Sequence, residues 1–299
     1  MDPRRLELLL QLSRLGSMRE VSEALHVTTS TVSQQIAALA REVGTSLLEP
    51  DGRRVRLTPA GRRLADHAVT VLAAIEAARA DLDPGAAPSG EVRVAAFATA
   101  VRTSLLPVVR TLAADHPDVR LRIHEHEPPE VMDLLSTDDV DLALTYDYNL
   151  APSTVDRTLE AVPLWETAWS LGVPMTRRAT GDALAVFERF RDQDWIVNSR
   201  HTADEEVVRT VAALAGFRPH VTHRADSLEL VQDMILAGLG VGLLPAGQRT
   251  VAGVSLLPLT NPQVLLRAFA VTRRGRGVWP PLALVLQLLG AASQDVGLV

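Results

Sequence analysis

The sequence predicts a multidomain α/β protein with a winged helix-turn-helix at 1–58, a long connecting helix at 59–82, a hinge at 83–90 and a two-lobed α/β body at 91–299. Three observations support this prediction. Apolar residues recur at helical spacing in the N-terminal part, a Thr-Pro pair then opens a longer helical pattern, and strands alternate with helices after a stretch rich in Pro and Gly. A chain of 299 residues is also too long for one hydrophobic core.

Composition excludes several classes of protein. A hydrophobic fraction of 47% and a charged fraction of 22% are typical of a globular chain. The sequence contains no Cys, so disulfides and thiolate metal sites are ruled out. No apolar run reaches the roughly 18 residues that span a bilayer, and the N-terminus lacks a signal-peptide pattern. We therefore expect a cytoplasmic protein without a membrane partner.

Charge is distributed unevenly along the chain. Residues 1–63 hold ten Arg against seven Asp or Glu, a net charge of +3, whereas the whole chain carries −6, which leaves −9 for the rest. A basic module joined to an acidic body predicts a polyanion partner for the first module only.

The first two helices are marked by their caps. Asp2 precedes Pro3 and an apolar repeat at positions 6, 9, 12 and 15, and Gly16 ends this helix. Ser17 and Glu20 form a Ser-x-x-Glu capping box for the next helix. This second helix is expected to bury Val21, Ala24 and Leu25.

A third helix follows the turn "HVTT", capped by Thr28 or Thr29. Val32, Ile36, Leu39 and Val43 form its core stripe, which leaves Ser30, Ser33, Gln34, Ala37 and Arg41 facing outward without a carboxylate. Two short helices joined by a tight turn form a helix-turn-helix, and hydroxyl and amide groups can bond base edges or phosphate oxygens. The alternative is an ordinary helical hairpin with a solvated face.

The segment "LLEPDGRRVRLTPAG" resembles the wing of a winged helix. Its turn at Asp51 and Gly52 lies between two short extended runs, and Arg53, Arg54 and Arg56 cluster there to reach phosphate or a minor groove. The predicted partner is double-stranded DNA, and the predicted contacts are Thr28, Thr29, Ser30, Thr31, Ser33, Gln34, Arg53 and Arg54.

The connecting helix begins at Thr58 and Pro59 and carries a regular apolar seam. The seam residues, at alternating spacings of four and three, are Leu64, Ala68, Val71, Ile75, Ala78 and Leu82. We expect this helix to pair two chains, because a helix-turn-helix usually binds two half-sites as a dimer. The alternative is a helix packed on its own body. "LDPGAAPSG" at 82–90 is the hinge that ends this region.

The body alternates strands and helices. Strands are expected at "EVRVAAFA", "VRLRIHEH", "VDLALTYD", "WETAWSLGV", "WIVN", "HVTHRA" and "VGLLP", with helices at 103–114, 130–136, 184–191, 203–215 and 227–237. Two βαβ units of this kind predict parallel sheets with helices on both faces. We assign 91–162 and 268–299 to lobe one and 163–267 to lobe two, with a ligand-binding cleft between them.

Several stretches resemble a LysR-type transcriptional regulator. They are "RLGSMREVSEALHVTTSTVSQQIAALAREVG", "GRRVRLTPAG", "LLPVVRTLAADHPDVRLRIHE", "DVDLAL" and "SLELVQDMILAGLGVGLLP", and they occur in the family's order. The resemblance implies a DNA-binding domain, a linker helix and a periplasmic-binding-protein-like effector domain, assembled as a dimer of dimers on a dyad-symmetric operator. Ala40 stands where Glu is common. Gln34 stands where members often have Arg or Lys; this departure favours adenine readout and leaves the half-site sequence open.

The effector is expected between the lobes, where strand ends meet helix N-termini. The candidate residues are Thr99, Ala100, Arg102, Thr103, Ser104, Pro128, Asn198, Ser199, Arg200, His201 and Asp226. Helix amides, hydroxyls and an Arg favour a small carboxylate-bearing metabolite. The Asp226 carboxylate opposes an anion and favours an amine. An amino acid carries both a carboxylate and an amine, so it would match both kinds of group. Alternatively, Thr103 and Ser104 only cap a helix and Arg200 points to solvent.

Other motifs are weaker. Gly238, Gly240 and Gly242 follow a helix and precede a strand, which is the wrong order for a dinucleotide site and fits a helix cap with close packing at the lobe interface. His124 and His126 share a strand face, but no third metal ligand is evident. The sequence contains no serine-hydrolase elbow. We therefore expect no cofactor, no metal and no enzymatic activity. The alternative functions are a DNA-binding architectural protein without a ligand and a solute-binding protein.

Overall fold

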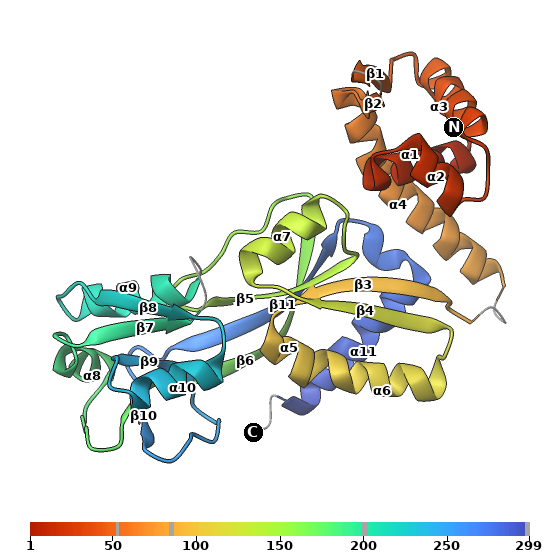
Figure 1. The fold of residues 1–299 in the computed structure, drawn as a ribbon. Coiled ribbons are helices and arrows are strands. Elements are labelled where there is room, and N and C mark those ends of the chain that lie inside the picture. Colours follow the sequence, from red (N-terminus) through yellow and green to blue (C-terminus); the bar gives the residue numbers. More distant parts are fainter. Residues whose placement is uncertain (52–53, 84–86, 199–202, 297–299) are drawn as a thin grey trace.

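The structure is a computed structural model that describes residues 1–51, 54–83, 87–198 and 203–296. A small helical region at the N-terminus leads through a long helix to an elongated α/β body (Figure 1). The N-terminal region contains α1 (Pro3–Leu15), α2 (Met18–Ala24), α3 (Thr29–Val43), β1 (Leu48–Asp51) and β2 (Arg54–Leu57). No helix among the described residues has the length and apolar character to cross a membrane.

The predicted caps of α1 and α3 are confirmed. The Asp2 carboxylate accepts from the Arg4 N–H, and the Thr28 hydroxyl accepts from the Thr31 N–H at 3.1 Å. Gly16 ends α1 in the left-handed conformation, with φ of 70°, where glycine carries no steric penalty. The capping box at Ser17 is wrong, because the Ser17 side chain makes no cap hydrogen bond.

A single apolar core holds the helix-turn-helix together. Val32, Ile36 and Leu39 of the predicted stripe are fully buried against α1, while Val43 is only half-buried. Ala24 of α2 was expected inside but is exposed. Ser22 is buried in its place, because its hydroxyl donates to the Arg19 carbonyl and so loses no hydrogen bond on burial.

The long helix α4 (Pro59–Leu82) begins at the predicted Thr58 cap. Its N-terminal half packs on the helix-turn-helix through its small and apolar residues, which are Gly61, Ala65, Ala68 and Val69. The predicted seam is therefore divided: Leu64 and Ala68 lie in the chain's own core, whereas Val71 is 40% exposed and Leu82 is 87% exposed.

The strands of the body form one mixed sheet, not the separate parallel sheets that the sequence predicted. Among the described residues nine strands pair in the order β4-β3-β5-β11-β6-β9-β7-β8, with β10 paired to β6. The strands are β3 (Gly90–Ala96), β4 (Val119–Glu125), β5 (Leu142–Tyr148), β6 (Leu159–Pro174), β7 (Asp194–Asn198), β8 (His220–Ala225), β9 (Val241–Pro245), β10 (Val254–Pro258) and β11 (Leu265–Arg273).

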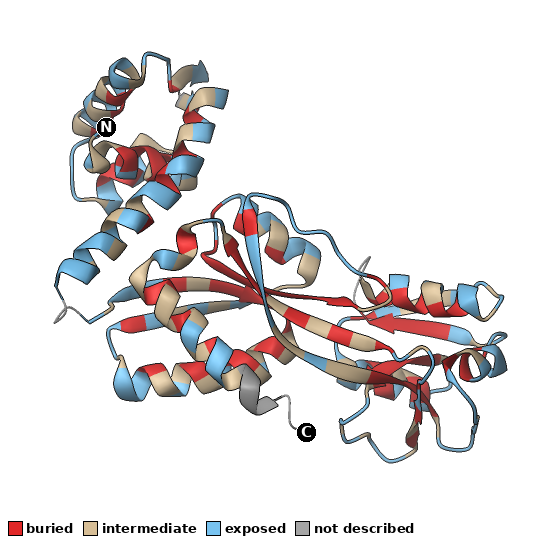
Figure 2. Cartoon of the chain, turned by 180° about the vertical axis from the view of Figure 1, so that it is seen from behind, coloured by how far each residue is buried: buried red, intermediate tan, exposed pale blue. Residues whose placement is uncertain are grey.

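Parallel pairing is confined to the ends of this sheet. β3 pairs in parallel with β4 and β5, and β7 pairs in parallel with β8 and β9. The long strands β6 and β11 run antiparallel between these two groups and so join the lobes into one sheet. β5 is buried along its whole length, whereas β6 is exposed or half-buried over residues 160–168, as the colouring in Figure 2 shows.

Helices cover both faces of the sheet (Figure 1). In lobe one α7 packs on one face, and the segment from α5 to α6 packs with α11 on the other. In lobe two α10 lies opposite α8 and α9. The helical elements are α5 (Ala98–Ala100), the π-helical turn η1 (Val101–Leu105), α6 (Leu106–Asp115), α7 (Pro128–Ser136), α8 (Ala183–Arg189), α9 (Ala203–Leu214), α10 (Leu228–Leu236), the 3₁₀ turn η2 (Arg276–Val278) and α11 (Pro280–Val296).

The helix expected at 103–114 begins five residues earlier, at Ala98. Thr103 and Ser104 therefore lie inside the helical segment, in η1, and not at its N-terminus. The Thr103 hydroxyl donates to the Thr99 carbonyl at 2.9 Å, so it bonds back to the preceding turn and caps nothing.

Candidate functional site

The outward face of α3 is polar and accessible, as predicted. Thr29, Ser30, Ser33, Gln34 and Ala37 are all exposed, and Glu42 near the C-terminus of α3 is its first carboxylate. The Thr28 hydroxyl lies 2.8 Å from the hydroxyls of both Ser30 and Thr31. This hydroxyl cluster fixes the first turn of α3, and the following turn presents Ser33 and Gln34 to solvent. Such a face can donate to phosphate and exchange hydrogen bonds with base edges.

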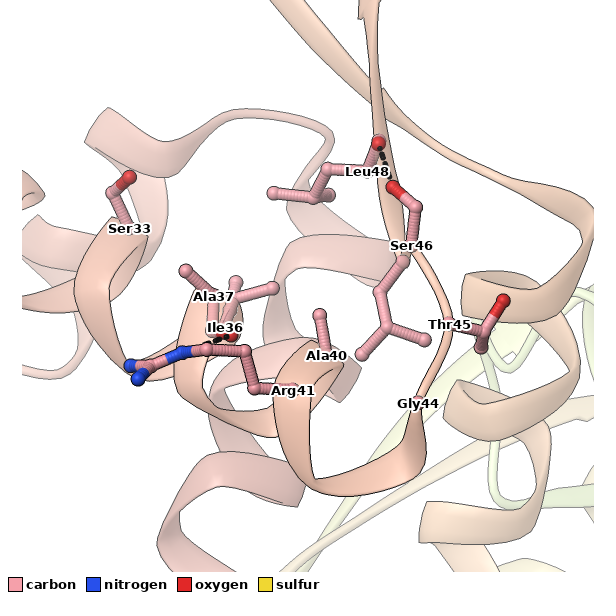
Figure 3. Close-up of a pocket in the computed structure, with 10 residues that line it drawn as sticks. Ser33, Ile36, Ala37, Ala40, Arg41, Gly44, Thr45, Ser46 and Leu48 are labelled. Carbon is pink, nitrogen blue, oxygen red and sulfur yellow. Dashed lines mark hydrogen bonds between the residues drawn. The ribbon is translucent and has the colours of Figure 1, made fainter.

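Beside this face lies a groove of about 530 Å³, which the sequence did not predict (Figure 3). The C-terminal half of α3 forms one wall, and the segment from Gly44 to Leu48 forms the other (Figure 3). Gly44 adopts a φ of 71°, which turns the chain back along the helix. Ile36, Ala37, Ala40, Leu47 and Leu48 line the groove with apolar surface, and Ser33 and Arg41 extend it to the face described above.

The predicted wing has the strands of a β-hairpin. β1 and β2 pair antiparallel, with Asp51 opposite Arg54. The Arg56 guanidinium forms a salt bridge of 2.8 Å with Glu49 on the facing strand, so part of its charge is compensated within the hairpin. Gly52 and Arg53 lie outside the described residues, as does the side chain of Arg54.

The lobe-one candidates lie at the start of the helical segment that follows β3. Ala100 is fully buried, and Thr99 is half-buried. Ser104 is 2% exposed, and its hydroxyl accepts from the Trp165 indole N–H at 2.9 Å. Arg102 forms a salt bridge of 3.1 Å with Glu229 of α10, which bridges the two lobes at the surface. These groups position aromatic residues and connect lobes rather than cap a helix.

The lobe-two candidates are only partly described. Asn198 ends β7 and is 5% exposed, and neither the nitrogen nor the oxygen of its amide group has a hydrogen-bond partner among the described residues. Asp226 follows β8 directly, next to the Ser227 cap of α10. Ser199, Arg200 and His201 lie outside the described residues. Pro128 opens α7 on the lobe-one side, preceded by Glu127.

Four functional candidates at the lobe junction were missed in the sequence: Tyr146, Tyr148, Asp204 and Glu127. Tyr146 and Tyr148 of β5 both donate hydrogen bonds to the Asp204 carboxylate of α9, at 2.5 Å and 2.7 Å. Asp204 is 2% exposed, so these bonds are made away from water. The signal was a Tyr at every second position of a strand, which puts both rings on one face. Their common partner lies more than fifty residues away, and periodicity cannot reveal it.

Glu127 joins this group from α7. The Tyr146 hydroxyl lies 3.3 Å from the Glu127 carboxylate. Burial, together with the negative charges of Asp204 and Asp226, raises the pKa of Glu127 to about 7. Burial and the charge of Asp204 also raise the pKa of Tyr148 well above its usual value, so its hydroxyl stays protonated as a donor. Carboxylates from both lobes thus face one another at the junction.

Aromatic rings surround these carboxyl groups. Phe97 stacks edge-on against Tyr146 with ring centroids 4.7 Å apart, and Tyr148 meets Trp169 at 5.6 Å. Trp165 lies 6.3 Å from Phe97 and completes the series. Apolar walls with a few convergent polar groups are typical of a small-molecule site between domains.

Two further motifs have structural roles. Gly238 ends α10 with φ of 77°. A Cβ on Gly240 would lie 2.3 Å from the Asp194 carbonyl oxygen, and one on Gly242 would lie 2.8 Å from the carbonyl oxygen of Ile196. The glycines therefore allow close packing inside lobe two, not at the lobe interface as expected. His124 and His126 have ring centroids 6.4 Å apart, and no group of three metal-ligating side chains occurs within the described ranges.

The geometry defines a class of protein: a helix-turn-helix protein with a polar, accessible α3 face and a two-lobed α/β body. Residues 3–62 match the family described as "Bacterial regulatory helix-turn-helix protein, lysR family", and residues 85–294 match the "LysR substrate binding domain". The chain belongs to the LysR family of transcriptional regulators. The predicted family and fold class are thereby confirmed.

Known relatives agree with this assignment. The transcriptional dual regulator GltC of Bacillus subtilis is 25% identical over 285 residues, which cover 91% of this chain and 93% of GltC. Full-length OxyR from Pseudomonas aeruginosa has the same fold, with a TM-score of 0.74 at 21% identity and 98% of both chains covered. CbnR in complex with its target DNA aligns with a TM-score of 0.54 at 19% identity, covering 98% of this chain and 100% of that one.

Proposed function

We propose that this protein binds a dyad-symmetric DNA operator as a dimer and regulates transcription in response to a small molecule held between its two lobes. The observation that carries the proposal is the exposed face of α3. This face presents hydroxyl and amide groups, and the helix has no carboxylate before Glu42. The related CbnR has been captured with its target DNA, which supports the same role here. Because the proposed DNA operator lies in the cytoplasm, we expect the protein to be cytoplasmic. We also expect it to act by binding DNA and effector and not by catalysis.

In this proposal α3 enters the major groove. Thr28, Thr29, Ser30, Thr31, Ser33 and Gln34 are the proposed contacts from α3, with Arg53 and Arg54 on phosphate from the wing. Gln34 is the residue most suited to read a base, because an amide can bond adenine in a bidentate manner. Arg53→Ala should weaken binding to every sequence and flatten its salt dependence, since a phosphate contact carries no base information.

The decisive experiment is a fluorescence-anisotropy titration with the promoter region flanking the protein's own gene. Gln34→Ala should cost about 1–3 kcal/mol of discrimination at one position of each half-site. The matched control is Gln35→Ala, because the Gln35 amide already accepts from the Arg5 guanidinium at 2.9 Å. Unchanged sequence preference in Gln34→Ala, together with unchanged salt dependence in Arg53→Ala, would mean that α3 is not the recognition helix.

The dimer is proposed to form along the C-terminal part of the α4 seam, which consists of the exposed Val71, Ala78 and Leu82 and the half-buried Ile75. Leu82 and Val71 are exposed in the single chain, although their spacing is that of a helix-pairing seam. Val71→Asp should dissociate the pair, whereas Ala80→Asp on the opposite side of the helix should not. Light scattering at micromolar concentration measures this, and a monomeric wild-type protein contradicts the proposal. Further association into a dimer of dimers would occur through the effector domains.

The effector is proposed to lie at the lobe junction, in contact with the residues predicted there. Described members of this set are Thr99, Ala100, Thr103, Ser104, Pro128, Asn198 and Asp226, and the proposal extends to Ser199, Arg200 and His201. Because Glu127, Asp204 and Asp226 add carboxylates to this junction, a carboxylate-bearing effector needs an amine as well. An amino acid satisfies both ends.

A thermal-shift panel on the full chain tests the effector class. Amino acids should raise the unfolding temperature by mass action, whereas the corresponding amines and carboxylic acids should each do so less. Thr103→Val and Arg200→Ala should abolish the shift and the effector response while sparing DNA binding. A full response in both variants would locate the effector elsewhere. An architectural protein without a ligand would show DNA binding and no shift with any compound.

A further inference from the structure

A group of charged residues connects the DNA-binding domain to lobe one. The Arg14 guanidinium of α1 donates to the Asp138 carboxylate at 2.6 Å, across 124 residues of sequence. Arg273 of β11 lies 3.5 Å from the other oxygen of Asp138 and 2.8 Å from the Asp66 carboxylate of α4. These four residues, named here the interdomain cluster, join α1 of the DNA-binding domain and the connecting helix α4 to β11 and the turn after α7 in lobe one.

Asp138 occupies an unusual backbone position. It follows α7 with φ of 64°, in the left-handed region that only Gly, Asn and Asp adopt readily. A glycine would terminate α7 with less strain, but it would offer no carboxylate to Arg14. Asp138 is 5% exposed, so its charge is held largely away from water and depends on its Arg partners.

A second set of contacts fixes the turn that carries Asp138. Arg93 of β3 donates to both oxygens of the Asp141 carboxylate at 3.0 Å and to the Asp138 carbonyl at 2.8 Å. Arg276 adds a bond of 3.1 Å to Asp141. Burial opposes ionisation of Asp141, but these guanidinium groups outweigh it and lower the pKa of the carboxyl group. The turn is thus held from lobe one and is bonded outward to α1.

A close backbone approach accompanies the charges. The Thr70 hydroxyl of α4 donates to the Arg274 carbonyl at 3.1 Å. A Cβ on Gly275 would lie 2.6 Å from the Thr70 methyl group, so glycine is needed for α4 to lie so near. The contact therefore involves packing as well as ion pairs.

Two elements of lobe one, α7 and β5, link the interdomain cluster to the lobe junction. α7 has Glu127 and Pro128 at its N-terminus and Asp138 just beyond its C-terminus, and nine helical residues span about 13 Å. β5 leads from Asp141 back to Tyr146 and Tyr148. Buried apolar residues pack α7 against the sheet, so the helix and strand are held as one unit between the two sites.

We propose that the interdomain cluster transmits the state of the lobe junction to the DNA-binding domain through α7 and β5. The inference rests on the proposed function for the junction as an effector site, but the cluster can be tested without DNA or effector. A change in the contact between Tyr148 and Asp204 shifts β5 and α7 as a unit, and the Asp138 carboxylate then holds or releases Arg14. Release frees α1, and with it the helix-turn-helix core, from lobe one.

Hydrogen exchange on the full-length protein tests the first link. Arg14→Gln and Asp138→Asn should each speed amide exchange in the last turn of α1 by about tenfold or more, because each removes the ion pair between Arg14 and Asp138, whose side chains are largely shielded from water. Asparagine retains the left-handed backbone at 138, so folding is preserved. The double variant should exchange no faster than either single variant. The control is Arg122→Gln, whose salt bridge of 3.1 Å with Glu91 is exposed and lies within the body.

Tyr148→Phe tests transmission. This substitution removes one hydrogen bond at the junction, while Tyr146 still donates to Asp204. Exchange at α1 should rise about threefold or more in the wild-type background and not at all in Arg14→Gln, since the connection is already broken there. Equal effects of Tyr148→Phe in both backgrounds, or multiplicative effects of Arg14→Gln and Asp138→Asn, overturn the inference. A wild type that binds no DNA would overturn the proposed function and leave this result intact.

Discussion

The DNA-binding domain and the effector body differ in where their functional groups lie: at the surface in the first and in the interior in the second. In the N-terminal domain the core is apolar and local, and the candidate contacts are exposed side chains of one helix, α3. In the body the central polar groups of the lobe junction are buried and bonded to partners far along the chain, as Tyr148 is to Asp204 across 56 positions. A surface that binds a polyanion needs accessible groups, whereas a small ligand needs groups shielded from water.

The two regions also differ in the interactions that stabilise them. Val32, Ile36 and Leu39 contribute through burial of apolar surface. In the body, Asp138, Asp141 and Asp204 are nearly as buried, but each must be compensated by specific donors. Substitutions of buried charges in the body are therefore expected to cost more than substitutions of polar groups on α3.

The largest effect is expected at Asp141. Asp141→Ala leaves Arg93 and Arg276 without their shared carboxylate and should lower the free energy of unfolding by about 3–5 kcal/mol. Urea denaturation monitored by circular dichroism measures it. Glu91→Ala removes an exposed carboxylate that pairs with Arg122 and should cost about 1 kcal/mol or less. Equal losses in the two variants would contradict the contrast between buried and exposed pairs.

An intermediate effect is expected from pH. The pKa of Glu127 is raised from 4.5 to about 7 in the folded chain, so the native state holds a proton that the unfolded state releases. Stability contributed by this group is therefore full below about pH 4.5 and declines as the pH rises to about 7. The decline should amount to about 1–3 kcal/mol, after allowance for partial exposure.

The Glu127 contribution is measured as the difference between wild type and Glu127→Gln. The denaturation midpoints of the two proteins, measured at closely spaced pH values, should diverge between about pH 4.5 and 7, because the Gln side chain does not titrate. A difference that stays constant from pH 4 to 8 would show that Glu127 titrates normally.

The smallest effect is expected in the DNA-binding domain. Thr28→Ala removes the cap of α3 and should destabilise the protein by about 1 kcal/mol, with faster exchange in the first turn of that helix. Ser17→Ala is the matched control, because Ser17 occupies the N-cap of α2 without making a cap bond and should cost about 0.5 kcal/mol or less. A larger cost at Ser17 than at Thr28 would reverse the assignment of caps.

Features with a local physical cause were predictable from the sequence. The cap at Thr58 and the bounds of α4 follow from a Thr-Pro start and helical periodicity, and the exposed face of α3 follows from its core stripe. Most strands of the body were also found, because alternation and β-branched residues mark them locally. The π-helical turn at 101–105 was missed, since its residues have the same periodicity as the α-helix that it interrupts.

The sequence by itself determined many local elements of this protein: most of its helices and strands, the caps at Asp2, Thr28 and Thr58, and the polarity of α3, but not α11 or the N-cap of α2. Only the tertiary structure decided how β6 and β11 join both lobes into one sheet, that Tyr146 and Tyr148 share Asp204, and that Arg14 reaches Asp138. The physical reason is range. Backbone propensity and periodicity act over a few residues, whereas a buried charge is satisfied by whichever donor the fold brings near, however distant in sequence.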